Sequence, residues 1–193
     1  QDSSARPDGE FILFSGRMVP MKNLSGVLDA FNLIKDKVPH RVVITGHNRK
    51  HSSSDASTAV PSNPALGGDR VEFKGHVSSG AMEQLMNEAS LLVFPSFYEG
   101  FGLPPLEGMA HGCPVVVSNV SSLPEVCGDA AEYVDPKDIH SIADGMYKVL
   151  TEGSLRLGMI KKGFERTRSF SWEKSAKEHL AIFDDAIDVA RPP

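Results

Sequence analysis

Short apolar runs recur along this chain, and a glycine, which commonly ends a strand, follows several of them. Phe11-Ile-Leu-Phe-Ser15 ends at Gly16, and Arg41-Val-Val-Ile-Thr45 ends at Gly46. A continuous apolar run of about four to eight residues is typical of a strand that is buried on both faces, as strands of a parallel sheet are. Since parallel strands need crossover connections, helices are expected between these runs.

Helical patterns do fill the intervals. Apolar residues recur at three- and four-residue spacing over residues 24–34, 80–90 and 139–149. Further strands are predicted over 71–75, 91–94, 114–118 and 131–134, and further helices over 155–168 and 172–189. Six buried strands interleaved with helices predict an α/β fold, namely a Rossmann-like, doubly wound, mainly parallel six-stranded sheet with helices on both faces and a helical C-terminal extension.

Two segments lack this patterning. Residues 1–10 are polar, contain Pro and Gly and show no periodicity, which predicts a linker or disordered lead-in. Residues 47–69 are rich in Ser, Pro and Gly and predict a mobile surface loop. One domain is therefore predicted over residues 11–193, a length that can bury a core of its own.

Composition excludes several classes of function. A net charge of −5 argues against general nucleic-acid binding, which needs a basic face. Cys113 and Cys127 form no C-x-x-C pair, so we expect reduced thiols and neither a disulfide framework nor a metal cluster. No signal-like segment and no apolar run long enough to span a bilayer occur, and we expect a cytoplasmic location.

The candidate site is the stretch over residues 94–114. It runs from a strand through a loop that holds Glu99, Gly100 and Gly102, into a helix whose first turn is expected to carry two prolines and Glu107. Glycines let backbone amides approach a ligand, and a helix N-terminus attracts an anion such as a phosphate. Two carboxylates beside an anion site suit hydroxyl groups better than phosphate. An anion joined to a polyol suggests a nucleotide sugar.

These residues resemble a known family. Glu99-Gly-Phe-Gly-Leu-Pro-Pro-Leu-Glu107, with the Glu-x7-Glu spacing intact, and Ser122-Leu-Pro-Glu125 look like the C-terminal, donor-binding domain of retaining glycosyltransferases of the GT-B fold, family 4. Further motifs follow in the family's order. They are Gly16-Arg17 with Lys22, Gly75-His-Val77, Asp135-Pro136 and Phe170-Ser-Trp-Glu173. Several separate motifs in the family's order support the resemblance much more strongly than a lone Glu-x7-Glu would.

The resemblance implies roles for individual residues. Glu99 would bind donor-sugar hydroxyls, Glu107 would hold the ribose hydroxyls, and Arg17 and Lys22 would neutralise the leaving diphosphate. The predicted catalytic residues are thus Arg17, Lys22 and Glu99. The predicted donor-binding residues are Gly16, His76, Val77, Gly100, Phe101, Gly102, Leu103 and Glu107, with His76 and Val77 at the base and the 101–103 amides at the diphosphate or sugar.

Each role has a structural alternative. Glu107 could merely favour the helix dipole, which is worth about 0.3–1 kcal/mol. Glu99 and Arg17 could be solvated surface residues, and His76 an ordinary loop histidine. His111 is interpreted as a helix-end residue and Trp172 as a packing residue.

The implied reaction is transfer of a hexose from a nucleoside-diphosphate donor to an acceptor hydroxyl with retention of configuration. A departing diphosphate mainly needs its charge stabilised. No metal-ligand cluster or Asp-x-Asp-type motif is present, so we expect metal-independent transfer without a cofactor. The amino-acid sequence of residues 118–125 is similar to that of bacterial mannosyltransferases of cell-surface polysaccharide assembly. This similarity favours GDP-mannose over a UDP-sugar as the donor.

The family's architecture has a second α/β domain, and we expect that this N-terminal acceptor domain is absent here. It would bind the acceptor, a glycan or lipid-linked sugar, and the full enzyme could associate peripherally with the cytoplasmic face of a membrane. The chain alone should bind nucleotide weakly and transfer nothing, and its terminal helix should expose apolar surface. Two other classes stay open, a non-catalytic nucleotide-sugar-binding module and a GT-B-fold epimerase or phosphorylase.

Overall fold

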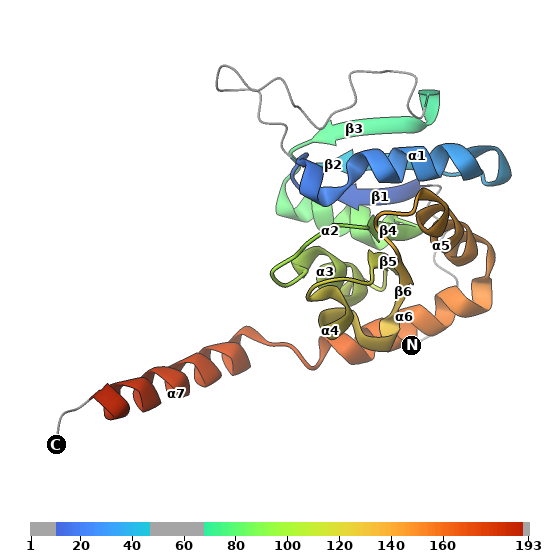
Figure 1. Ribbon diagram of the computed structural model, residues 1–193. Helices are drawn as coiled ribbons and strands as arrows, with labels where there is room; N and C mark the ends of the chain where they lie inside the picture. Colours follow the sequence, from blue (N-terminus) through green and yellow to red (C-terminus); the bar gives the residue numbers. More distant parts are fainter. Residues whose placement is uncertain (1–10, 47–67, 191–193) are drawn as a thin grey trace, which may run out of the picture.

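The six predicted strands form one sheet in the order β3-β2-β1-β4-β5-β6, and every pair of neighbours is parallel (Figure 1). The computed structural model describes residues 11–46 and 68–190, so the predicted lead-in and most of the predicted loop at 47–69 lie outside the described residues. The doubly wound α/β fold is confirmed. The strands are β1 (Phe11–Ser15), β2 (Arg41–Thr45), β3 (Val71–Gly75), β4 (Leu91–Phe94), β5 (Val115–Ser118) and β6 (Ala131–Val134).

Helices cover both faces of the sheet. They are α1 (Leu24–Ile34), α2 (Ser79–Glu88), α3 (Leu103–Ala110), α4 (Leu123–Cys127), α5 (Ile139–Thr151), α6 (Gly153–Thr167) and α7 (Trp172–Ala190). Successive residues of a strand point to opposite faces. Ile12 and Phe14 of β1 therefore pack with α1 and α5, whereas Phe11 and Leu13 pack with α2, α3 and α4.

Only the four inner strands are buried throughout or nearly so, which corrects the prediction of six buried strands. β3 and β6 occupy the two edges of the sheet, and the Phe73 side chain in β3 is 46% exposed. An edge strand has a neighbour on one side only, and helices cover it less completely. Short apolar runs identify strands but do not tell which of them lie at the edges.

The C-terminal extension is helical as predicted, but Trp172 at its start does not pack as predicted. Ser171 caps α7, since its hydroxyl accepts a hydrogen bond from the Lys174 N–H at 3.1 Å. From there α7 projects away from the sheet (Figure 1). Trp172 is consequently 80% exposed, so its interpretation as a packing residue is wrong.

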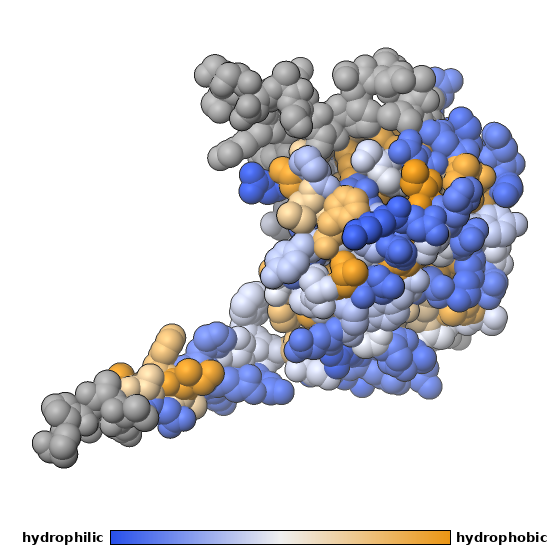
Figure 2. Space-filling view, in the orientation of Figure 1, coloured by the Kyte–Doolittle hydropathy of each residue, from blue (hydrophilic) through white to orange (hydrophobic). Residues whose placement is uncertain are grey.

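One side of α7 carries exposed apolar residues. Leu180, Phe183 and Ile187 lie at helical spacing and are each more than half exposed, and Figure 2 shows apolar side chains gathered on this helix. The structure thus shows the exposed apolar surface expected on the terminal helix.

Asn23 joins three loops at the carboxyl edge of the sheet. It precedes α1 in the left-handed conformation, with φ of 57°, and is 5% exposed. Its side-chain amide donates hydrogen bonds to the carbonyls of Pro95, at 3.2 Å, and Pro136, at 2.8 Å. The connections that follow β1, β4 and β6 are therefore held together by one side chain.

Replacing Asn23 by Ala is expected to lower the free energy of unfolding by about 2–3 kcal/mol, because two buried carbonyls lose their donor and Ala disfavours the left-handed conformation. Asn23→Gly is the matched variant, since it removes the same hydrogen bonds without that conformational cost and should destabilise less. Urea unfolding followed by circular dichroism measures both. A loss below about 0.5 kcal/mol for Asn23→Ala would contradict the role of these bonds.

Candidate functional site

A cavity of about 470 Å³ opens at the carboxyl ends of β1 and β2, beside the start of α2. Open α/β sheets bind ligands at this edge. Five of the predicted site residues line it, although they come from three separate parts of the sequence. They are Gly16, Arg17, His76, Val77 and Glu107.

Three glycines lie at the carboxyl ends of the neighbouring strands β1, β2 and β3. Gly16, Gly46 and Gly75 have φ values of 155°, 132° and 66°. The Gly16 N–H donates to the Thr45 carbonyl at 3.1 Å, and the Gly46 N–H to the Gly75 carbonyl at 2.8 Å. A Cβ atom on Gly46 would lie 1.8 Å from the Gly16 carbonyl oxygen, so the two backbones meet where no side chain fits. Sequence reasoning missed Gly46, although it ends its strand as Gly16 does.

The cavity has a mixed electrostatic lining. Arg17 supplies a cation, and Glu83 and Glu107 supply carboxylates. His111 also lines it, which the sequence interpretation missed, while its backbone N–H caps α3 as expected by donating to the Glu107 carbonyl at 3.1 Å. The His111 Nδ1 lies 3.2 Å from the Asn87 side-chain oxygen. An anion and hydroxyl groups could both be bound within one ligand here.

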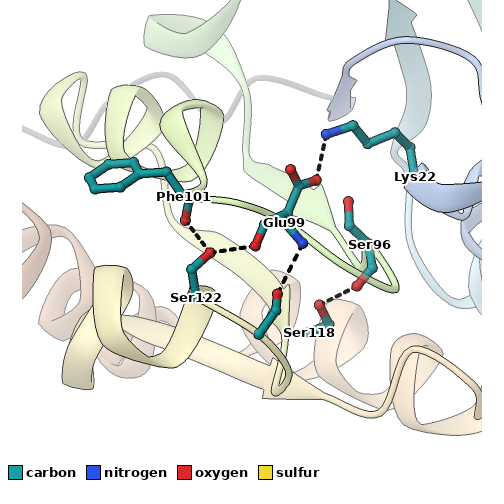
Figure 3. A network of polar contacts seen from close by, with 7 residues as sticks. Lys22, Ser96, Glu99, Phe101, Ser118 and Ser122 are labelled. Atoms are coloured by element: carbon teal, nitrogen blue, oxygen red, sulfur yellow. Dashed lines mark hydrogen bonds and ion pairs between the residues drawn. The ribbon is translucent and has the colours of Figure 1, made fainter.

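Two predicted catalytic residues contact each other. The Lys22 ammonium lies 2.5 Å from a carboxylate oxygen of Glu99 and 4.9 Å from the centre of the Phe94 ring (Figure 3). Their side chains are 21% and 12% exposed, so the ion pair is largely shielded from water. The sequence assigned them to different parts of a ligand. The structure instead makes them one neutral pair next to the loop that leads to α3.

The helix α3 starts at Leu103, after Gly102 in the left-handed conformation. Its two prolines are confirmed in the first turn, but Glu107 is the fifth residue and lies beyond that turn, which corrects the predicted position. No carboxylate in the first turn of α3 therefore offsets its positive end. The two prolines have no N–H, and the Leu106 N–H donates to the Gly102 carbonyl at 3.4 Å, so the Leu103 N–H is the amide of this turn that suits an anion.

A second cavity, of about 660 Å³, lies on the other side of Glu107. Phe101 and Leu103 line this cavity and not the one beside Arg17. Phe101 packs edge-on against Phe170, with ring centres 5.7 Å apart, and the Arg166 guanidinium lies 4.9 Å from the Phe170 ring centre. The predicted donor-binding residues thus fall on both sides of Glu107. Gly100 lies in the exposed loop between Glu99 and Phe101.

Comparison with known proteins identifies the family. A parallel sheet with a ligand-sized cavity at its carboxyl edge defines a doubly wound α/β binding domain. Residues 1–166 match the family model for "Glycosyl transferases group 1". The chain therefore belongs to the group 1 glycosyltransferases.

The relatives include mannosyltransferases. O-antigen chain mannosyltransferase B of Escherichia coli is 35% identical over 175 residues, which cover 90% of this chain and 45% of that protein. Serotype-specific mannosyltransferase WbdA of Escherichia coli is 31% identical over 183 residues, which cover 94% of this chain and 22% of that protein. The chain thus spans less than half the length of these relatives.

Solved structures share the fold. A sucrose-phosphate synthase from Thermosynechococcus elongatus superposes with a TM-score of 0.77 at 24% identity, over 95% of this chain and 47% of that one. Anabaena HepE, solved with UDP and glucose, gives a TM-score of 0.77 at 17% identity, over 93% of this chain and 49% of that one. Among the described residues, no helix is long and apolar enough to cross a membrane.

Proposed function

We propose that this chain is the donor-binding domain of a retaining glycosyltransferase and that its cavity beside Arg17 holds a nucleoside-diphosphate sugar. One observation carries the proposal: residues from three separate sequence motifs line a single cavity of about 470 Å³, together with the strand-end glycine Gly46. Small-molecule sites commonly measure about 300–1,000 Å³, so the volume suits a nucleotide.

The ligand's parts match the lining. The base lies against His76 and Val77, and Glu107 accepts hydrogen bonds from the ribose hydroxyls. The diphosphate lies near Arg17 and the backbone amides of residues 101–103, which lead into α3. Its sugar reaches the Lys22–Glu99 pair, where the carboxylate accepts hydrogen bonds from the sugar hydroxyls and the ammonium faces the departing charge.

The reaction is transfer of a hexose from this donor to an acceptor hydroxyl. Breaking the bond between sugar and diphosphate concentrates negative charge on the leaving group, and preorganised cations and amides lower that barrier. Arg17, Lys22 and the backbone amides before Pro104 supply them without a metal ion. The names of the Escherichia coli relatives support mannose as the transferred sugar and a growing surface polysaccharide as acceptor, and we propose GDP-mannose as the donor. The transfer belongs to the whole protein.

Calorimetry with GDP, UDP and ADP tests the donor site. The chain is expected to bind GDP more tightly than UDP or ADP. Glu107→Gln should weaken GDP binding about tenfold or more, because charge-assisted hydrogen bonds to the ribose are lost. Glu165→Gln, on the exposed face of α6, is the matched control and should leave the affinity unchanged.

Two outcomes would contradict the proposal. The first is a folded chain that binds none of the three nucleotides. The second is an unchanged GDP affinity in Glu107→Gln, which would place the nucleotide elsewhere.

A further inference from the structure

We propose that Ser121 and Ser122, in the connection between β5 and α4, are positioning residues that fix the loop carrying Glu99 for recognition of the donor sugar. This inference rests on the proposed function, and it concerns residues that do not themselves line the cavity beside Arg17.

The two serines hold the Glu99 backbone from both sides. The Glu99 N–H donates a hydrogen bond to the Ser121 hydroxyl oxygen at 3.0 Å. The single O–H of Ser122 is shared between two carbonyl oxygens, that of Phe101 at 2.7 Å and that of Glu99 at 3.0 Å (Figure 3). The backbone polar groups of Glu99 are thus bound by side chains more than 20 residues away in the sequence.

The connection itself is shaped for these contacts. Ser121 adopts a φ of 54°, in the left-handed region that residues other than glycine seldom occupy. Such a conformation persists where the surrounding structure requires it, and it clusters at functional sites. At the last residue of β5, just before this connection, the Ser118 hydroxyl donates to the Ser96 carbonyl at 2.6 Å. Hydroxyls from the end of β5 and from the connection after it therefore bind the loop after β4 at its start and at Glu99.

Fixing this backbone directs the Glu99 side chain. Neither Glu99 nor Gly100 belongs to a helix or strand, so no regular hydrogen-bond ladder holds this part of the loop. The Glu99 carboxylate nevertheless reaches Lys22 at 2.5 Å with only 12% of its side chain exposed. A carboxylate held in place before the ligand arrives loses less conformational freedom on binding. The serines should therefore affect the sugar and not the nucleotide.

Calorimetry of the 193-residue chain with GDP and with GDP-mannose separates these effects. Ser122→Ala is expected to lower the ratio of GDP-mannose to GDP affinity between about threefold and tenfold, as for loss of one hydroxyl's hydrogen bonds. The GDP affinity itself should stay within about twofold. Ser122→Thr keeps the hydroxyl and should restore the ratio.

Thr151→Ala is the matched control. The Thr151 hydroxyl also donates to a backbone carbonyl, that of Tyr147 at 2.8 Å, but it lies at the last residue of α5. This variant should leave the ratio unchanged. If Ser122 had a merely structural role, Ser122→Ala would lower stability, as Thr151→Ala does, but would not alter the ratio of GDP-mannose to GDP affinity.

The remaining outcomes also decide the proposal. An unchanged ratio in Ser122→Ala, or a wild-type chain that binds GDP and GDP-mannose equally, overturns it. A wild-type chain that binds neither ligand contradicts the proposed function, and nitrogen-15 NMR of the Lys22 ammonium then tests the positioning role alone. Loosening of the Lys22–Glu99 pair in Ser122→Ala should speed hydrogen exchange of that ammonium at least about threefold. An unchanged exchange rate overturns the positioning role.

Discussion

Replacing Gly46 by Ala is expected to lower the free energy of unfolding by about 3–5 kcal/mol or to prevent folding. The new Cβ atom would lie 1.8 Å from the Gly16 carbonyl oxygen, and φ at this position is 132°, which alanine disfavours. The strand ends would have to separate. Urea unfolding followed by circular dichroism measures the loss, and calorimetry with GDP should show weaker binding in any variant that folds.

Gly158→Ala provides the control for this variant. Gly158 lies inside α6, and a Cβ atom there would meet no atom within 4 Å. An exposed helical glycine replaced by Ala should raise stability by roughly 0.5–1 kcal/mol. If Gly46→Ala were as stable as the wild-type chain, the close approach of the two strand ends would be refuted.

Replacing Lys22 by Ala in the complete enzyme is expected to lower turnover about a hundredfold, and Arg17→Ala should have a similar effect. Loss of the ammonium removes charge stabilisation of the leaving diphosphate. It also leaves the Glu99 carboxylate, with a side chain only 12% exposed, without the cation that lies 2.5 Å away. Steady-state kinetics with the proposed donor, GDP-mannose, and a surface-polysaccharide acceptor measures turnover.

The matched control is Lys162→Ala. Lys162 also forms an ion pair, with Asp129 at 3.0 Å, but their side chains are 49% and 80% exposed. Exposed pairs contribute about 0–1 kcal/mol to stability, and this one lies on α6, so turnover should be unchanged. A decrease below about threefold for Lys22→Ala would refute its proposed role, because loss of one such donor typically costs far more.

The sequence allowed most of the fold to be predicted, because parallel sheets need strands that are apolar on both faces. The runs at β1, β2, β4 and β5 show this directly, and their spacing leaves room for one helix each. The order of the strands in the sheet cannot be predicted in the same way. The edge positions of β3 and β6 follow from how the chain crosses the sheet, and Glu72, Lys74 and Glu132 are the local sign that these two strands are less buried. Trp172 could not be placed either, since nothing in its neighbourhood shows that α7 leaves the sheet.

The sequence predicted which residues belong to the site, but only partly how these residues are arranged. Gly16, Arg17 and Glu107 stand at positions where loops and a helix must reach the carboxyl edge, so their convergence was predictable. The Lys22–Glu99 pair joins residues 77 positions apart. Ser122 is likewise 23 positions from Glu99, and its role becomes visible only from the hydrogen bonds. Such contacts depend on the register of loops, which hydrophobic periodicity does not fix.

The edge-on contact of Phe101 with Phe170 has a thermodynamic consequence. Phe170 stands two residues before α7, whose apolar side is exposed, while Phe101 belongs to the loop that follows Glu99. Any partner that binds α7 and shifts the Phe170 ring must also change the free energy of that loop. Linkage then requires reciprocity: the factor by which such a partner changes donor affinity is the factor by which the donor changes affinity for the partner.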